Sequence, residues 1–546
     1  MIMKKTIFMG VLVGACLSSN LVIADYRQGG TLRVPIINTG FVENYNPYTT
    51  KDLLHGVMFE PLFVYNNMTN KVDYRLADNV EYSEDLTRLY VTLKPNLQWS
   101  DGKALSSEDV AFSYNLIQSV PAFDTKGIWS QGHLKSVTAL DDKTIVFEMH
   151  GADSNMMWNL PYYHVLPKHT WQNQENYPTF TNAANPVGNG PMTEVSYNKP
   201  QQFELCRNPN YYLSGKPYLD CIQYNSYNDN SQIQPALMKG KIDWGSNFIA
   251  DVEKTFVAKD KENHHVWYPP NDAVHFYINT KKKPFDNLAV RQALSMALDR
   301  EAIVDIAAYG YPTVNFNMGG LGELYKASIS ETVSKEFGYL SEYNPEAAKA
   351  LLDKANIIDK DGDGIRETSD GKPLIFDIQV VNGWTDWIQV VQMAGEYFAE
   401  IGIKANLKTV DWSVYDRALK QGDYEVAINW SLAAPNPILV YQEYFSSSRI
   451  GKAFHAGHGF HNPMLDALIE DFGKLRDQQK QADIINKLQH VTAENLPFIP
   501  LFSNPTWFQF NTSKIVGWPS EENPYVHPVW YDGGKRVILL NQLHLK

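Results

Sequence analysis

The chain has 546 residues, a formal net charge of −13 and three cysteines, with 44% hydrophobic and 20% charged residues. This length suggests about three or four domains, which bury large cores without disulfide scaffolding. The acid excess argues against nucleic acid as a partner, because non-specific affinity for phosphates needs clustered Lys and Arg. No apolar run beyond the N-terminus approaches the roughly 20 residues that cross a bilayer, so the mature protein is expected to be soluble.

The N-terminus has the pattern of an export signal. Lys4 and Lys5 precede an apolar stretch over residues 7–17, and Ala24 ends a plausible cleavage site. This predicts a signal peptide over residues 1–24. A lipoprotein signal is the alternative, with Cys16 as the lipidated residue. Either signal places the protein outside the cytoplasm, and we expect it in the periplasm.

An oxidising compartment allows Cys206 and Cys221 to form a disulfide. Two buried thiols are the alternative. A bridge closing a loop of about 15 residues is worth roughly 3 kcal/mol in the chain-entropy model.

The first half has the pattern of an α+β unit. Short strands are predicted over residues 31–34, 90–93 and 144–148, with turn signals at Asp101-Gly102 and Asp141-Asp142. From about Tyr343 the pattern changes, because Asn344-Pro345 is typical of a helix start and residues 346–355 are rich in helix formers.

The second half has the pattern of a parallel sheet flanked by helices. Residues 374–381 predict a strand, Thr385 caps a helix over 386–401 that Gly402 ends, and residues 403–410 predict a second strand. A further helix over 414–421 leads to a strand over 424–430. We expect a mainly parallel sheet, with ligands beyond the carboxyl ends of its strands.

Indoles and polar groups follow two of these strands. Asn382, Trp384 and Asp386 come after the first, and Asn429-Trp430 ends the last. A flat apolar face bordered by hydrogen-bonding groups suits a pyranose ring. Packing of the sheet edge by these tryptophans is the alternative.

Three separated motifs resemble the family 5 extracellular solute-binding proteins of ABC importers. They are the stretch over residues 93–102 with Glu108-Asp109-Val110, the stretch over 187–191, and the stretch over 290–294. Residues 263–270, 382–387, 517–518 and 521–524 look like the chitin-oligosaccharide and cello-oligosaccharide receptors of this family.

The resemblance implies an α/β fold of the two-lobed periplasmic binding protein type (cluster C), with mixed sheets flanked by helices and an extra α+β subdomain in the first lobe. The implied divisions are residues 25–65, 185–279 and 503–546 for lobe I, 66–184 for its subdomain, and 280–502 for lobe II.

The resemblance also implies site residues for a β-1,4-linked oligosaccharide of glucose or N-acetylglucosamine. Trp384 and Trp518, on opposite lobes, would sandwich one sugar ring. Asp386, Asn429 and Asn382 would bond ring substituents, and Tyr441 would add a further face. Glu43 stands where chitin-oligosaccharide receptors tend to carry Arg, which replaces a fork of donors by an acceptor and weakens chitin specificity.

The main alternative is an oligopeptide or dipeptide receptor of the same family. Peptide receptors commonly follow the corresponding strand with an acid that receives the α-amino group, whereas residues 431–437 contain none. Asp386 could substitute. The implied partners are the ligand and the membrane permease subunits, with a membrane sensor kinase left open, and the protein is expected to act as a monomer.

No catalytic, metal or cofactor site is predicted. Glu521 and Glu522 are sequence neighbours, which rarely face each other as glycosidase carboxylates do. His455, His458 and His461 alternate with glycines in what reads as a flexible loop. The acidic run from Asp359 to Asp363 departs from a calcium loop at its seventh and twelfth positions, and is interpreted as a tight turn.

Overall fold

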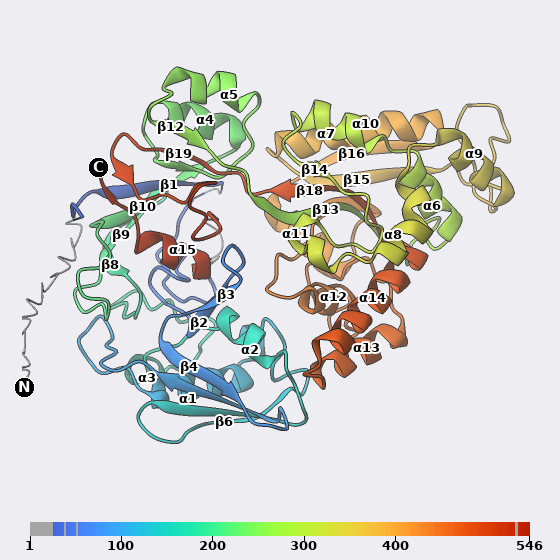
Figure 1. The fold of residues 1–546 in the computed structure, drawn as a ribbon. Helices are drawn as coiled ribbons and strands as arrows, with labels where there is room; N and C mark the ends of the chain where they lie inside the picture. Colours follow the sequence, from blue (N-terminus) through green and yellow to red (C-terminus); the bar gives the residue numbers. More distant parts are fainter. Residues whose placement is uncertain (1–25, 38–39, 51–52, 530–532) are drawn as a thin grey trace, which may run out of the picture.

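The computed structural model describes residues 26–37, 40–50, 53–529 and 533–546. The predicted signal peptide, its alternative anchor Cys16 and Asp25 lie outside these residues. In the described part of the chain, no helix is both long and apolar enough to cross a membrane. The chain folds into two lobes joined by long strands, with a subdomain below the first lobe in the view of Figure 1.

The first lobe is built around a four-stranded sheet in the order β1-β10-β9-β8. β1 runs parallel to β10, and the other neighbours are antiparallel. A second sheet, β11-β19-β12, combines strands from the middle and the end of the chain. The elements of this lobe are β1 (Thr31–Ile37), β2 (Phe63–Asn66), β3 (Lys71–Tyr74), β8 (Met192–Lys199), β9 (Gln202–Arg207), β10 (Cys221–Tyr227), α4 (Asn230–Met238), β11 (Trp244–Gly245), α5 (Val252–Thr255), β12 (His264–Val266), β19 (Gln509–Asn511), β20 (Ile515–Val516), α15 (Gly533–Leu540) and β21 (His544–Leu545).

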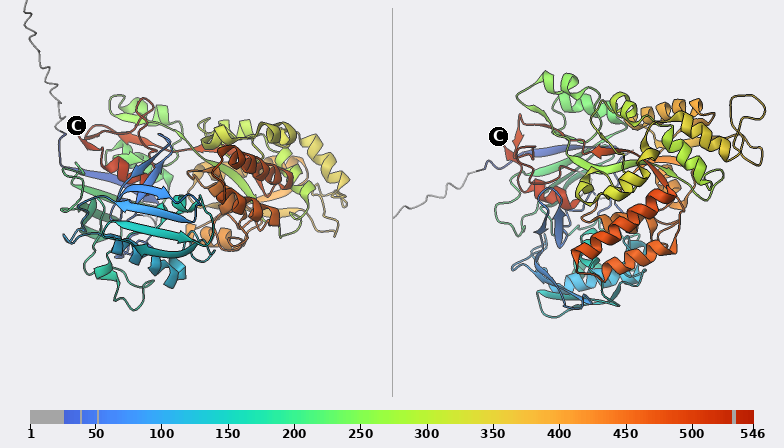
Figure 2. Two further views of the ribbon diagram at one scale, coloured as in Figure 1. Left: turned by 60° about the horizontal axis from the view of Figure 1, so that its bottom comes forward. Right: turned by 45° about the vertical axis from the view of Figure 1, so that its right-hand side comes forward.

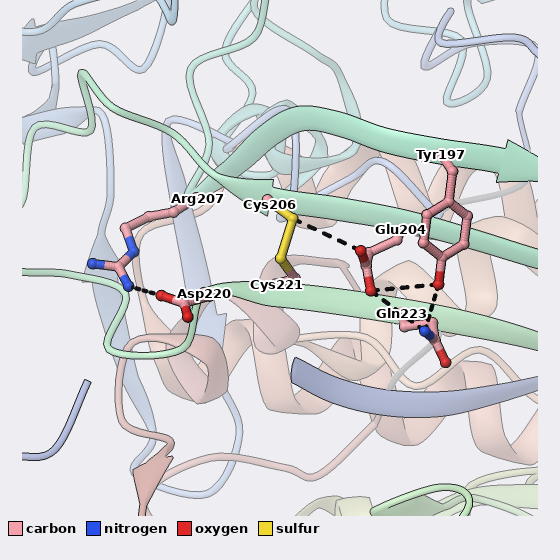
Figure 3. Close-up of a disulfide and its surroundings, with 7 residues drawn as sticks. All are labelled: Tyr197, Glu204, Cys206, Arg207, Asp220, Cys221 and Gln223. Atoms are coloured by element: carbon pink, nitrogen blue, oxygen red, sulfur yellow. Dashed lines mark hydrogen bonds and ion pairs between the residues drawn. A yellow bond between two sulfur atoms is a disulfide. The ribbon is translucent and has the colours of Figure 1, made fainter. Parts of the chain in front are cut away.

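The predicted disulfide is present and joins two neighbouring strands of the first lobe. Cys206 and Cys221 lie opposite each other on β9 and β10 and are bonded through their sulfur atoms. Figure 3 shows the bridge between the two strands, beside the side chain of Glu204. The alternative of two buried thiols is therefore wrong.

The subdomain is an antiparallel sheet in the order β4-β5-β7-β6, covered by one long helix, α1. It confirms the α+β pattern of the early sequence, because the strands predicted over 90–93 and 144–148 lie within β5 and β7. Its elements are β4 (Ala77–Tyr82), β5 (Arg88–Leu93), α1 (Ser107–Ser119), β6 (Leu134–Ala139), β7 (Thr144–Met149), α2 (Met156–Asn159) and α3 (Lys168–Trp171).

The second lobe holds a six-stranded sheet in the order β14-β18-β13-β17-β15-β16, with helices on both faces. β15 is parallel to β16 and β17, while β13 is antiparallel to β17 and β18. Its elements are β13 (Pro270–Ile278), α6 (Leu288–Met296), α7 (Arg300–Ala307), β14 (Thr313–Val314), α8 (Glu331–Phe337), α9 (Pro345–Lys354), β15 (Ile375–Val381), α10 (Thr385–Glu400), β16 (Lys404–Val410), α11 (Trp412–Gln421), β17 (Val426–Trp430), α12 (Pro437–Phe445), α13 (Pro463–Gly473), α14 (Gln478–Asn495) and β18 (Phe498–Pro505).

Two sequence expectations for this lobe need correction. The sheet is mixed rather than mainly parallel, because the strands arriving from the first lobe and returning to it add antiparallel neighbours. The N-cap of α10 is Trp384, and Thr385 is the first residue of the helix. By contrast, Asn344 caps α9 as predicted, since its side chain accepts a hydrogen bond from the amide of Ala347 at 2.9 Å.

Two chain crossings connect the lobes. β13 enters the second lobe from the first, and β18 runs back beside it. The predicted lobe boundaries stay our proposal. The second lobe also contacts the subdomain, where the amide of Ser154 donates to the Gly473 carbonyl at 2.7 Å and Arg476 donates to the Ser83 carbonyl at 2.6 Å. Figure 2 shows α13 beside the subdomain in its right-hand view.

Candidate functional site

The parallel strands of the second lobe end at an edge that carries three indoles. Trp384 follows β15, Trp412 follows β16, and Trp430 ends β17. The rings of Trp412 and Trp430 are stacked, with centroids 5.9 Å apart and planes 15° apart, and Trp384 lies 5.9 and 5.7 Å from them. Phe454 adds a ring 5.0 Å from Trp430.

All four rings are only half-buried. We call Trp384, Trp412, Trp430 and Phe454 the aromatic wall. Parallel packing brings the three indoles together, because carboxyl ends of parallel strands share one edge of a sheet, and Phe454 joins them from the segment after α12. Trp412 and Phe454 were not among the sequence candidates. The signal for Trp412 was present, because it follows its strand as Trp384 follows the preceding one.

The loop that carries Trp384 reaches the first lobe. A Cβ atom at Gly383 would lie 3.0 Å from the Cβ atom of Asp229, the N-cap residue of α4. Gly383 has a φ of +86°, a conformation that L side chains rarely adopt. The aromatic wall therefore stands beside the junction of the two lobes, as a site closed by lobe movement requires.

Asp386 lies in the first turn of α10, next to the aromatic wall, and is 6% exposed. Burial raises the pKa of this carboxyl to about 6, while the backbone N–H of Trp387 opposes the shift. The carboxyl has no ion-pair partner among the residues described. Asn382 is exposed on the same loop, and its backbone amide donates to the Val410 carbonyl at 2.8 Å.

Glu43 belongs to the other lobe. It is exposed, in a loop anchored by hydrogen bonds from the Phe41 amide to the Pro200 carbonyl and from Asn198 to the Val42 carbonyl. Pro200 lies in the turn between β8 and β9, at the sheet edge where β1 and β10 end. Glu43 thus lies on the same edge of the first lobe as the Asp229 contact.

Trp518 is not placed as the sequence suggested. Its side chain is 7% exposed, its Nε1 donates to the Ile515 carbonyl at 2.8 Å, and its ring packs against Trp244, Phe508 and Phe510 in the core of the first lobe. Trp384 packs against the cores of the second lobe. The structure does not bring these two indoles together, and the predicted sandwich is corrected accordingly.

Two further sequence candidates are also interior residues. Tyr441 is fully buried on α12, where its hydroxyl donates to the Gly319 carbonyl at 2.8 Å. Asn429 is fully buried on β17, opposite His275 of β13, and its Oδ1 accepts a hydrogen bond from the Tyr415 hydroxyl at 3.5 Å. Because side chains alternate along a strand, Asn429 lies on the opposite face of the sheet from its neighbour Trp430.

An ionic cluster joins the second lobe to the subdomain. Arg449 pairs with Glu443 at 2.7 Å and donates to the backbone carbonyl of Lys126 at 2.7 Å. The Lys126 ammonium lies 3.9 Å from the same Glu443 carboxylate. Burial raises the pKa of Glu443, but the positive charges of Lys126 and Arg449 lower it by more, so that the pKa is about 2.

These three residues line a small inter-lobe pocket of about 10 Å³, beside Leu432 of the loop that follows β17. That volume has room for about one water molecule. A larger pocket of about 430 Å³ lies at the opposite edge of the second-lobe sheet, around the C-terminal end of α10. It contains none of the candidate site residues.

Three further groups of titratable residues lie outside the aromatic wall. His455 and His458 are buried, so the predicted flexible loop is wrong at these positions. Asp359 accepts hydrogen bonds from the amides of Gly362 and Gly364, as a tight acidic turn requires. Glu521 and Glu522 are exposed.

Comparison with known proteins shows which family has this fold and site. Residues 71–452 match the family model of bacterial extracellular solute-binding proteins, family 5. The chain is 27% identical to the oligopeptide-binding protein AppA of Bacillus subtilis, covering 87% of this chain and 86% of that protein. It is 24% identical to heme-binding protein A of Haemophilus influenzae, covering 87% and 86%.

Solved structures share the fold. A periplasmic oligopeptide-binding protein of Thermotoga maritima with bound mannohexaose superposes with a TM-score of 0.87 at 26% identity, covering 94% of this chain and 98% of that chain. AppA of Bacillus subtilis in complex with a nonapeptide superposes with a TM-score of 0.79 at 24% identity, covering 95% and 100%. The matched segment and the shared two-lobed fold establish that this chain belongs to the family 5 extracellular solute-binding proteins, the non-enzymatic receptors that serve the permease subunits of ABC importers.

Proposed function

We propose that this protein is a periplasmic receptor that captures a β-1,4-linked oligosaccharide, built of glucose or N-acetylglucosamine units, between its two lobes. The aromatic wall is the observation that carries the proposal. Three half-buried indoles and a phenyl ring at one strand edge offer flat apolar faces to the axial hydrogens of successive sugar rings.

Polar groups on both lobes complement the wall. Asp386 and Asn382 flank it on the second lobe, and Glu43 lies on the edge of the first lobe that carries Asp229. We assign these three residues to the hydroxyl groups at the sugar edge. The Thermotoga maritima relative, which is named an oligopeptide-binding protein and has mannohexaose bound, supports a carbohydrate ligand on this fold.

A peptide ligand is the second candidate, and one observation favours it. Asp386 is a buried carboxyl that lacks a cation partner in the described part of the chain, and a peptide ammonium would supply one. Against it, the loop over residues 431–437 carries no acid. A carboxylate beside the aromatic wall also suits a sugar, because it accepts hydrogen bonds from neutral donors such as hydroxyl groups.

Calorimetry with cellobiose, chitobiose and a dipeptide separates the candidates. We expect heat of binding from at least one disaccharide and none from the dipeptide. Trp384→Ala and Trp412→Ala should each weaken sugar binding by about 2 kcal/mol or more, as loss of a buried aromatic anchor does. Trp129→Ala is the matched control, since this half-buried indole lies in the subdomain. Tight dipeptide binding with silent sugars would overturn the proposal.

Function requires that the ligand favour the closed form. Shifting a two-state equilibrium from 1:99 to 99:1 needs about 5.5 kcal/mol of differential binding. A ligand that contacts only the aromatic wall cannot provide this, because the wall belongs to one lobe. Residues that face the ligand from the first lobe or from the crossing strands are therefore part of the mechanism.

A further inference from the structure

Trp158 is an indole of the subdomain that lies against the second lobe. It belongs to α2, on the side of the subdomain that faces the second lobe in Figure 1. Its ring packs against the hydrophobic core on which Trp384 and Trp412 of the aromatic wall also pack. The other partly buried side chains at this core, among the described residues, belong to the second lobe. The subdomain therefore brings one indole to the surface that surrounds the aromatic wall.

The first lobe and its subdomain hold Trp158 in place. The Tyr65 ring of β2 meets the indole edge to face, with centroids 5.4 Å apart and planes 80° apart. The backbone amide of Trp158 donates to the Asn155 carbonyl at 3.0 Å, and that of Met157 donates to the Tyr82 hydroxyl of β4 at 3.0 Å. An indole that is fixed in this way loses little conformational entropy when a ligand packs on it.

The indole of Trp158 is only half-buried, so part of it is accessible to a ligand. Among the described residues, none accepts a hydrogen bond from its Nε1, which leaves this N–H group for a ligand hydroxyl. A pyranose ring combines an apolar face with hydroxyl groups at its edge, and so matches a flat apolar ring that carries one donor.

The chain between the aromatic wall and the surroundings of Trp158 is short. Asn159, the residue after Trp158, lines the small inter-lobe pocket together with Leu432. Leu432 follows Trp430 by two residues, in the loop after β17. Two residues of extended chain span at most about 7 Å. An oligosaccharide stacked on Trp430 therefore comes next to the subdomain within a short distance.

We propose that Trp158 is the part of the ligand site that the subdomain supplies, and that it stacks on the sugar unit next to those held by the aromatic wall. This inference rests on the proposed function, and it names a contact on the first-lobe side of the kind that closure requires. A ligand of two or more rings then touches the aromatic wall with one ring and Trp158 with the next, so its binding favours the closed form. A single ring touches one of the two surfaces and lacks this effect.

Calorimetry on three substitutions tests the stacking, with cellobiose and chitobiose as the ligands. Trp158→Ala should weaken the binding of the disaccharide that wild type prefers by about 10- to 100-fold, as loss of an aromatic anchor does. Trp158→Leu should weaken it nearly as much, because leucine keeps apolar bulk between the lobes but has no flat face. Trp158→Phe should recover most of the affinity, because phenylalanine restores a flat face. Trp129→Ala, a half-buried indole elsewhere in the subdomain, is the control and should bind as wild type does.

The comparison of Trp158→Leu with Trp158→Phe separates ligand stacking from packing between the lobes. Urea melts without ligand establish that each variant is folded, and if Trp158→Ala is not, the other two variants decide. Wild-type affinity in Trp158→Leu would mean that the indole only fills space between the lobes, and would overturn the inference. The proposed function would still stand in that case if Trp384→Ala weakens sugar binding. Wild-type protein that binds the dipeptide and neither disaccharide would overturn both.

Discussion

Replacing Lys126 by Met should weaken the binding of every ligand by a similar factor, although Lys126 lies outside the aromatic wall. Its ammonium is 3.9 Å from the Glu443 carboxylate across the contact between subdomain and second lobe. Opening the lobes would separate these charges, whereas Arg449 would stay with Glu443 in the second lobe. The substitution therefore acts on the closed state and leaves the ligand contacts in place.

The magnitude follows from the geometry. At this separation two unit charges attract by about 4 kcal/mol at an effective dielectric constant of 20. Both side chains are largely buried, with 15% and 10% exposure, so desolvation offsets much of the attraction on closing. We expect a net loss of about 1 to 2 kcal/mol, which is roughly a 5- to 30-fold weaker affinity. The hydrogen bond from Arg449 to the backbone carbonyl of residue 126 survives the substitution, because the substitution changes only the side chain.

Stopped-flow tryptophan fluorescence and calorimetry give the affinity and the dissociation rate. The loss should appear in faster dissociation, because the ionic contact forms only after closure. Lys135→Met is the matched control, since its partner Glu148 belongs to the same subdomain and Lys135 is 58% exposed. Unchanged dissociation in Lys126→Met, or a factor that differs widely between ligands, would refute the reasoning.

Two further predictions test other parts of the structure. Trp518→Ala should lower the free energy of unfolding by about 3 to 5 kcal/mol, as loss of a buried indole does, whereas Trp384→Ala should lower it by less, because the Trp384 ring is only half-buried. Equal stability of the two variants in urea melts would contradict this assignment. His458 is fully buried, its Nδ1 accepts from the Phe460 amide, and burial lowers its pKa to about 3. As the pH falls, His458 is therefore protonated first in the unfolded state, and the free energy of unfolding should fall as the pH drops from about 6.5 toward 3. His458→Gln should flatten the dependence of this free energy on pH by up to about 1.4 kcal/mol per pH unit. An unchanged dependence would count against the prediction.

Local patterns in the sequence sufficed for much of the second lobe. The strand over 374–381 and the start of α9 follow from alternation and capping, which act over a few residues. The mixed character of the sheet was missed because β13 and β18 are far apart in the chain, and pairing between such segments leaves no short-range signal.

The candidate site was predicted in part for the same reason. Trp384 and Asp386 follow a strand directly, and the structure places them at the edge that the parallel pattern implies. Trp518 was assigned from resemblance alone, and burial against Trp244 and Phe508 decides its role.

The chain's last segment has a consequence for biogenesis. β19 inserts between β11 and β12, so a strand made late in synthesis completes a sheet that begins some 250 residues earlier in the chain. The first lobe cannot reach its final pairing while its C-terminal strands are still on the ribosome. This sheet of the first lobe therefore cannot form until synthesis has passed residue 511.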